Sequence, residues 1–332
     1  MRNKTEAIEV RPYQVLCAIC HVGAEECPPG VRALTDAIAA GPDRPITLVC
    51  NAGGVFAYQQ PGTDSDSDDG PEFNCKRDLD ILQRLDLAPG STPPARTLLM
   101  LTMAAIPTVK GICGYDRVTA DIWRGCAHAD SGRYERNREL GVAPFIAARP
   151  EEELVGEKLR SMEALHSASE VTIRPHLLMC ATCQYGAGIR PPLRDDNLPE
   201  LLELILSERP DLPIRFAPGA DWMMCAPCPA RVPELNACVN TMGSGGLSNQ
   251  KRDLDLLRLL GLGYGSSLPA RELLLLLFER VRSTREVCGR DNRLPSVWWD
   301  GCGEHNHENP QGNENHRKGR RALLRRLRKL SG

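Results

Sequence analysis

An internal repeat constrains this sequence more than any other feature. The segment VTIRPHLLMCATCQYG at 171–186 repeats the Arg-Pro pair, the two cysteines and the glycine of IEVRPYQVLCAICHVG at 8–23. Further on, NCKRDLD at 74–80 matches NQKRDLD at 249–255. Solenoid repeats recur every 20–50 residues, and this period is much longer. The sequence therefore predicts two fused, homologous domains.

The apolar pattern predicts an α+β fold in which each mainly helical domain has a short strand pair and cysteine-rich metal-binding loops. Short strands are expected at 45–49 and 212–216, and amphipathic helices at 29–40 and 198–208. In the second of these helices, one apolar face is formed by Leu198, Leu201, Leu202 and Ile205. The expected order is a first repeat with a degenerate cysteine set at 1–140, a charged linker at 141–170, a second repeat with a CxxCP metal site at 171–310, and a basic tail at 311–332.

Composition and charge indicate a soluble protein of the cytoplasm. The chain is 42% hydrophobic and 25% charged, begins MRNKTEAIEV without an apolar signal region, and has no apolar run long enough to span a membrane. Thiols stay reduced in the cytosol, so metal binding is a better explanation for the 14 cysteines than disulfides are. The alternative is secretion by a route that the sequence does not show, with seven disulfides.

The strongest metal motif is the loop GADWMMCAPCPARVPELNAC at 219–238. Its two-residue spacing lets the sulfurs of Cys225 and Cys228 point into one site, and Cys238 can supply a third ligand. Thiolates are strong ligands for zinc and iron. The loop is therefore interpreted first as a metal site.

Two CxxC pairs fall on predicted helices: Cys17 with Cys20, and Cys180 with Cys183. Residues at i and i+3 lie on one helix face, so each pair can present two sulfurs together. A helical cysteine can instead be an ordinary buried residue. In the first half, Cys17 and Cys20 could join Cys50 and Cys75 in one site, or that half could be free of metal.

A third group of cysteines lies near the end of each half. In the first half these residues are Cys113, Cys126 and His128, and in the second half Cys288, Cys302 and His305. Mixed thiolate and imidazole ligands suit zinc. These residues could form a separate zinc site or contribute to the cluster pocket, or the GxC sequence could be a packed corner with solvated histidines.

The basic segment HRKGRRALLRRLRKL at 316–330 has leucines at helical spacing. A solvated helical tail is the simpler interpretation, and contact with an acidic partner, RNA or anionic lipid is the alternative. The net charge of −2 and the aromatic content of 5% argue against nucleic-acid binding by the rest of the chain.

The second half resembles the domain of unknown function 1284 family, which is regarded as iron–sulfur binding. The resemblance rests on the Arg174-Pro-His-Leu-Leu-Met-Cys180 opening, the Cys225-Ala-Pro-Cys-Pro229 loop with Cys238, and a closing Leu-Gly-Leu-Gly-Tyr-Gly. It covers 174–281 well and 11–108 weakly, where Tyr13 replaces the histidine and CxxCP is missing. The resemblance implies that Cys180, Cys225, Cys228 and Cys238 bind a cluster, with Cys183 as a helper or bystander.

Three functions are compatible with these patterns. The favoured one is a cytoplasmic iron–sulfur protein that transfers electrons to a redox partner protein or senses redox state. A [4Fe–4S] cluster is the favoured cofactor. The second is a zinc-stabilised scaffold or adaptor. The third is an enzyme whose cluster has an open coordination position, although the sequence contains no Walker loop, dinucleotide fingerprint or nucleophile elbow.

Overall fold

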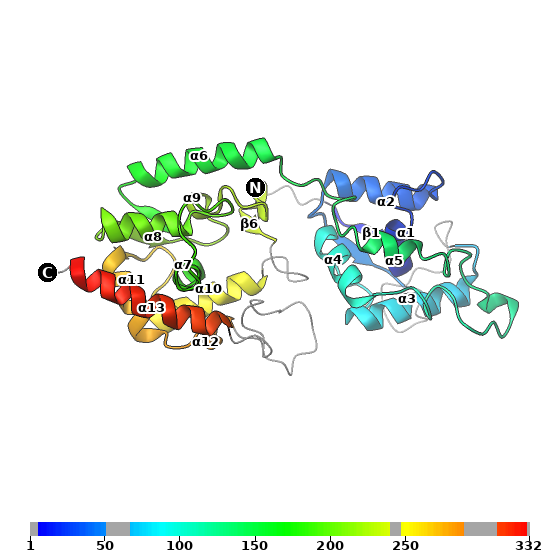
Figure 1. Cartoon of the computed structure of the whole chain (residues 1–332). Helices are drawn as coiled ribbons and strands as arrows, with labels where there is room; N and C mark the ends of the chain where they lie inside the picture. Colours follow the sequence, from blue (N-terminus) through cyan, green and yellow to red (C-terminus); the bar gives the residue numbers. More distant parts are fainter. Residues whose placement is uncertain (1–5, 51–66, 240–246, 289–310, 331–332) are drawn as a thin grey trace. The chain divides into compact units, whose positions relative to one another are not determined.

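The computed structural model describes residues 6–50, 67–239, 247–288 and 311–330. The chain divides into two compact units, Met1–Ala148 (unit 1) and Arg149–Gly332 (unit 2) (Figure 1). Small sheets and many helices occur in both units, which agrees with the predicted α+β class.

Unit 1 is built around a parallel pair of short strands. Its elements are β1 (Ile8–Val10), α1 (Pro12–Cys20), α2 (Pro29–Ala40), β2 (Ile46–Leu48), α3 (Pro71–Leu85), α4 (Ala95–Ala105), the 3₁₀ turn η1 (Asp121–Trp123) and α5 (Arg133–Arg138). β1 pairs with β2 in parallel, with Glu9 opposite Thr47. Pro12 begins α1 because its ring fixes a helical φ and its missing N–H needs no partner in the first turn.

Unit 2 follows a similar order of elements. They are α6 (Glu151–Ser167), β3 (Val171–Ile173), α7 (Pro175–Gly186), α8 (Leu198–Ser207), β4 (Pro213–Phe216), α9 (Trp222–Cys225), β5 (Arg231–Val232), η2 (Pro233–Leu235), β6 (Ala237–Cys238), α10 (Leu247–Leu260), β7 (Ser267–Pro269), α11 (Ala270–Arg280), α12 (Arg285–Cys288) and α13 (Gln311–Leu330). β4 lies between β3, its parallel neighbour, and β7, its antiparallel neighbour. The hairpin β5–β6 is separate from this sheet.

Each unit ties the start of its cysteine-bearing helix to a later helix through a buried ion pair. In unit 1 the Nε atom of Arg11 lies 2.5 Å from Asp78 Oδ2. In unit 2 Arg174 Nη2 lies 2.7 Å from Asp253 Oδ2. All four side chains are at most 5% exposed, so the KRDLD run that marks the repeat supplies a structural carboxylate in both units.

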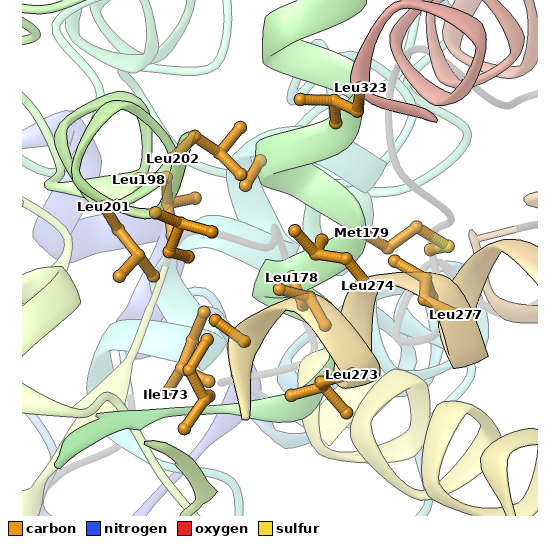
Figure 2. Close-up of a cluster of buried hydrophobic side chains, with 14 of the residues drawn as sticks. Ile173, Leu178, Met179, Leu198, Leu201, Leu202, Leu273, Leu274, Leu277 and Leu323 are labelled. Carbon is orange, nitrogen blue, oxygen red and sulfur yellow. The ribbon is translucent and has the colours of Figure 1, made fainter. Parts of the chain in front are cut away.

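The core of unit 2 is formed mainly by leucines from several helices. Figure 2 shows side chains of β3, α7, α8, α11 and α13 pointing toward one another. The apolar face predicted for α8 is confirmed, since Leu198, Leu201, Leu202 and Ile205 are all at most 1% exposed.

The segment predicted as a linker at 141–170 is different in the structure, because most of it is helix α6 of unit 2. Leu165 of α6 is fully buried in the core of that unit. Lys158 Nζ contacts Glu200 Oε1 at 2.7 Å, and Trp222 Nε1 donates a 2.5 Å hydrogen bond to Glu157. These contacts place the unit boundary at Ala148 and Arg149.

The basic tail is also corrected, because α13 is a docked helix and not a solvated one. α13 packs chiefly on α7 (Figure 1), and its Leu323 and Leu327 are buried. Gly319 of α13 meets Gly186 of α7 where the helices cross: a Cβ atom on Gly319 would lie 2.0 Å from the carbonyl oxygen of Thr182. Arg321, Arg325 and other basic side chains remain on the exposed side.

Candidate functional site

Four thiols of unit 1 line one small pocket. Cys17 and Cys20 come from one side of α1, and Cys113 and Cys126 come from the segment between α4 and α5. We call this the four-thiol pocket. Its volume is about 20 Å³, and its other lining residues are Leu16, His21, Arg77, Val109, His128 and Ala129.

Glycine geometry brings the two loop cysteines together. The backbone N–H of Cys126 donates a 2.8 Å hydrogen bond to the carbonyl oxygen of Cys113. Gly125 precedes Cys126 with a φ of 79°, and a Cβ atom there would lie 2.6 Å from that same oxygen. Because only glycine fits this left-handed corner, the Gly-Cys sequence at 125–126 fixes the position of the thiol.

The pKa values of three pocket thiols are raised, which disfavours their ionisation. Burial, partly offset by Arg77 and reinforced by neighbouring thiols, raises the pKa of Cys17 above its ordinary range and that of Cys113 to about 12. Burial, followed by the effect of Cys126, raises the pKa of Cys20 to about 11. The thiols of Cys17, Cys20 and Cys113 are therefore neutral at pH 7 unless a cation compensates their charge.

A buried guanidinium beside the pocket provides such compensation in part. Arg77 is 1% exposed and lies within electrostatic range of Cys17 and Cys113. It is held by a hydrogen bond to Asn74 and by the ring of Tyr13, whose centroid is 4.0 Å from Cζ. Its Nε atom is buried and has no hydrogen-bond partner in the described chain. The pocket thus combines anionic donors with a spare buried donor, which fits a group of net negative charge such as a metal with four thiolates.

Two histidines complete the wall of the pocket. The backbone N–H of His128 donates to Cys126 Sγ at 3.4 Å. The rings of His21 and His128 meet edge to face at 5.7 Å, and His21 Nδ1 lies 2.8 Å from the carbonyl oxygen of Cys17. The structure therefore brings the predicted group of Cys113, Cys126 and His128 to the helical CxxC pair.

The predicted grouping of Cys17 and Cys20 with Cys50 and Cys75 is not what the structure has. Cys50 follows β2 and is buried near Cys75 of α3. Burial, followed by Asp78 and then Cys75, raises the pKa of Cys50 to about 12. The thiols of α1 face the 109–129 segment instead. Two separate thiol groups therefore exist in unit 1.

In unit 2 three thiols gather at the β5–β6 hairpin, and we call them the hairpin thiols. Cys225 ends α9, the N–H of Cys228 donates to its carbonyl oxygen at 3.0 Å, and Cys238 pairs with Arg231 across the hairpin. The pKa of Cys225 is raised by burial, then by Cys228, and also by Asp221 and Cys238. Cys228 and Cys238 thus lie within electrostatic range of Cys225, and a metal site at this loop stays a prediction.

The other predicted ligands of unit 2 lie on helices. Cys180 and Cys183 are on α7, where Cys183 Sγ lies 3.9 Å from the carbonyl oxygen of Gly312, and Cys288 is buried at the end of α12. Cys302 and His305 lie outside the described residues. The set of Cys180 with the hairpin thiols, implied by the family resemblance, stays a prediction.

Within the described residues, no three cysteine, histidine or carboxylate side chains converge closely enough to hold a single metal ion. The donors of the four-thiol pocket line its wall without meeting at one point. No family model, curated protein or solved structure matches the chain. Among the helices of the described segments, each is too short or too polar to cross a bilayer.

Arg77 is the residue that the sequence reasoning missed. Its signal was present, because the KRDLD run that contains it recurs as Arg252 in the second half. A charged residue on a helix is usually solvated, so the run indicates an alignment of the two halves and does not by itself predict a site residue.

Proposed function

We propose that the protein binds an iron–sulfur cluster through Cys17, Cys20, Cys113 and Cys126 and takes part in electron transfer or redox sensing. The observation that carries this proposal is that four thiols line one small pocket next to a buried, unpartnered guanidinium nitrogen. Four thiolates are the usual protein ligands of [2Fe–2S] and [4Fe–4S] clusters.

A cluster and a single ion make different demands on the thiols. A structural zinc site needs four donors within about 2.3 Å of one point. In a cubane cluster each cysteine binds a different iron, so its ligands surround a group and need not converge. Four thiols that line one pocket from two segments of the chain are compatible with the second arrangement.

The surrounding residues have definite roles in this proposal. A bound cluster would supply one-electron redox chemistry. Arg77 offsets the negative charge of the thiolates, and the N–H of His128 donates to the Cys126 sulfur, which favours the reduced state. Leu16, Val109 and Ala129 keep the pocket apolar and limit access of water.

We further infer that unit 2 is a second copy of unit 1. Support comes from the shared order of elements and from the matching ion pairs Arg11–Asp78 and Arg174–Asp253. In such a copy Cys180, Cys183 and Cys288 correspond to Cys17, Cys20 and Cys113, and the sequence offers Cys302 as the counterpart of Cys126.

A zinc-stabilised scaffold is the second candidate, and the hairpin thiols favour it. A CxxC knuckle joined to a short hairpin with a third thiol is typical of zinc-binding modules. Zinc there would stabilise the loop from Ala217 to Val239 in the absence of a larger core. The basic face of α13 would then be the site that contacts a partner.

The test is the iron, acid-labile sulfide and zinc content of protein purified without oxygen, together with its visible spectrum. We expect about four iron and four sulfide per chain from the four-thiol pocket, and about eight of each if unit 2 has an equivalent site. Zinc without sulfide would overturn the cluster proposal and leave the scaffold in its place.

Cysteine variants locate the site. Cys113→Ser and Cys126→Ser should each remove the iron of unit 1 while leaving the chain folded. Cys27→Ser is the matched control, since Cys27 lies outside the pocket with its thiol against the carbonyl oxygen of Pro28. Equal iron in all three variants would show that the pocket is not the ligand set.

A further inference from the structure

Unit 2 contains a cavity that has no role in the functions proposed above. Its volume is about 180 Å³, and it lies beside the hairpin thiols, with Cys238 in its wall. Its polar lining comes from Arg174, Asn236, Gln250 and Tyr264. Apart from the thiol, the side chains on this wall can donate hydrogen bonds from a guanidinium, two amides and a phenol.

Arg174 is the group that defines the cavity chemically. It is 4% exposed, and its Nε and Nη2 atoms both bond to Asp253 Oδ2, at 2.9 and 2.7 Å. The other carboxylate oxygen is occupied by the backbone N–H of His176 at 3.0 Å and by its Nδ1 at 2.6 Å. No group of the described chain accepts a hydrogen bond from Arg174 Nη1. Arg174 is buried and lines the cavity, and its Nη1 atom can therefore donate a hydrogen bond to an oxygen atom of a ligand.

The remaining donors are available as well. Tyr264 is 36% exposed, and its hydroxyl has no partner among the described residues. The amide of Asn236 makes only a 3.4 Å contact with the carbonyl oxygen of Pro218. Gln250 is exposed on α10. Burial raises the pKa of the Tyr264 phenol, so the hydroxyl stays protonated and able to donate near neutral pH.

The wall formed by Gly219 and Asn236 is closely packed. Gly219 has a φ of 83° and Asn236 a φ of 48°, both in the left-handed region. A Cβ atom on Gly219 would lie 2.6 Å from both the amide nitrogen and the carbonyl oxygen of Asn236. The hairpin is therefore packed closely against this turn, and the cavity exists before any ligand binds.

We infer that this cavity binds a small oxyanion, a carboxylate or a phosphate, through Arg174, Tyr264 and the two amides. The ligand would lie against Cys238, so a small molecule would reach the edge of the hairpin thiols. The site does not depend on the cluster proposed for unit 1, because all its donors belong to unit 2.

The experiment is isothermal titration of the full-length protein with inorganic phosphate and, separately, with oxalate and acetate, at constant ionic strength set by chloride. We expect saturable binding of at least one oxyanion, and the order of affinities distinguishes a phosphate site from a carboxylate site. Titration of metal-free and metal-loaded protein keeps this result separate from the outcome for the cluster.

Two variants avoid Arg174, whose ion pair supports the fold. Tyr264→Phe removes one hydroxyl and should weaken binding by roughly 2- to 12-fold, the range for one hydrogen bond. Gln250→Glu places a negative charge at the cavity and should weaken binding by about tenfold or more. Gln83→Glu makes the same charge change at an exposed position of α3 and should leave the affinity unchanged.

The inference is overturned if no oxyanion gives saturable heat when its concentration is raised to about 100 times a millimolar Kd. It is also overturned if Gln83→Glu weakens binding as much as Gln250→Glu, because the effect would then come from net charge alone. Loss of affinity in Gln250→Glu with retention in Gln83→Glu supports it.

Discussion

The crossing of α7 and α13 leads to a sharp prediction for Gly319→Ala. Alanine normally stabilises a helix interior by about 1 kcal/mol relative to glycine. At this position the new Cβ atom would lie 2.0 Å from the carbonyl oxygen of Thr182, whereas ordinary contact begins at 3.4 Å. The two backbones would therefore have to separate by about 1.4 Å, the difference between these distances.

That separation has a calculable effect on stability. Forcing extra volume into a packed contact destabilises by roughly 1–3 kcal/mol. If α13 leaves α7, the burial of Leu323 and Leu327 is lost too, at roughly 1.5–3 kcal/mol each. Against a helix-propensity gain of about 1 kcal/mol, we expect unit 2 to lose up to about 2 kcal/mol of unfolding free energy if α13 stays docked, and about 2–5 kcal/mol if it leaves α7.

Pulse proteolysis in graded urea measures this change, with the fragments of the two units separated by mass. The transition of unit 1 should stay where it is and serve as an internal reference. Gly156→Ala in α6 is the matched control, since its Cβ would meet only the flexible Arg160 guanidinium, at 3.3 Å. That variant should gain about 0.5–1 kcal/mol. If Gly319→Ala stabilised unit 2 as Gly156→Ala does, the close crossing would be refuted.

Three more predictions concern charged groups. Asp253→Asn should destabilise unit 2 by roughly 3–5 kcal/mol because it breaks the buried Arg174–Asp253 ion pair. Asp255→Asn, which removes an exposed pair on the same helix, should change stability by less than about 1 kcal/mol. Urea unfolding of the two variants measures this difference. Burial lowers the pKa of His176, so the unfolded histidine gains a proton before the folded one does as the pH falls. Unit 2 should therefore lose stability below about pH 6.5. An unfolding midpoint that stays constant from pH 7 to pH 5 would contradict this. If the cluster proposal holds, Arg77→Met should release iron to a chelator severalfold faster, while Lys76→Met, on the exposed side of α3, should not; equal rates would remove Arg77 from the site.

Local pattern predicted the helices well. The helix predicted at 29–40 is α2 with the same limits, and the face of α8 was identified from its 3.6-residue spacing. Strand β7, which contains Ser267 and pairs with β4, was not predicted. That pairing is a long-range contact, and the Ser267-Leu268-Pro269 sequence has no local signal for it.

The grouping of the thiols could not be predicted from spacing. The sequence shows Cys17 and Cys20 on one face of a helix, but which loop covers that face depends on how the segment after α4 folds back. Gly125, which permits the close approach of Cys126, was visible only as part of a repeated Gly-Cys pair.

The docking of α13 on α7 also affects how the chain folds during synthesis. α7, with Cys180 and Cys183, leaves the ribosome well before α13, the helix that covers it. The side of α7 that α13 covers therefore stays exposed while α8 to α12 are made, whereas the elements of unit 1 can assemble as soon as α5 has emerged. A nascent chain would thus present the α7 thiols to solvent, to chaperones and to any factor that delivers metal, for as long as translation from α8 to α13 takes.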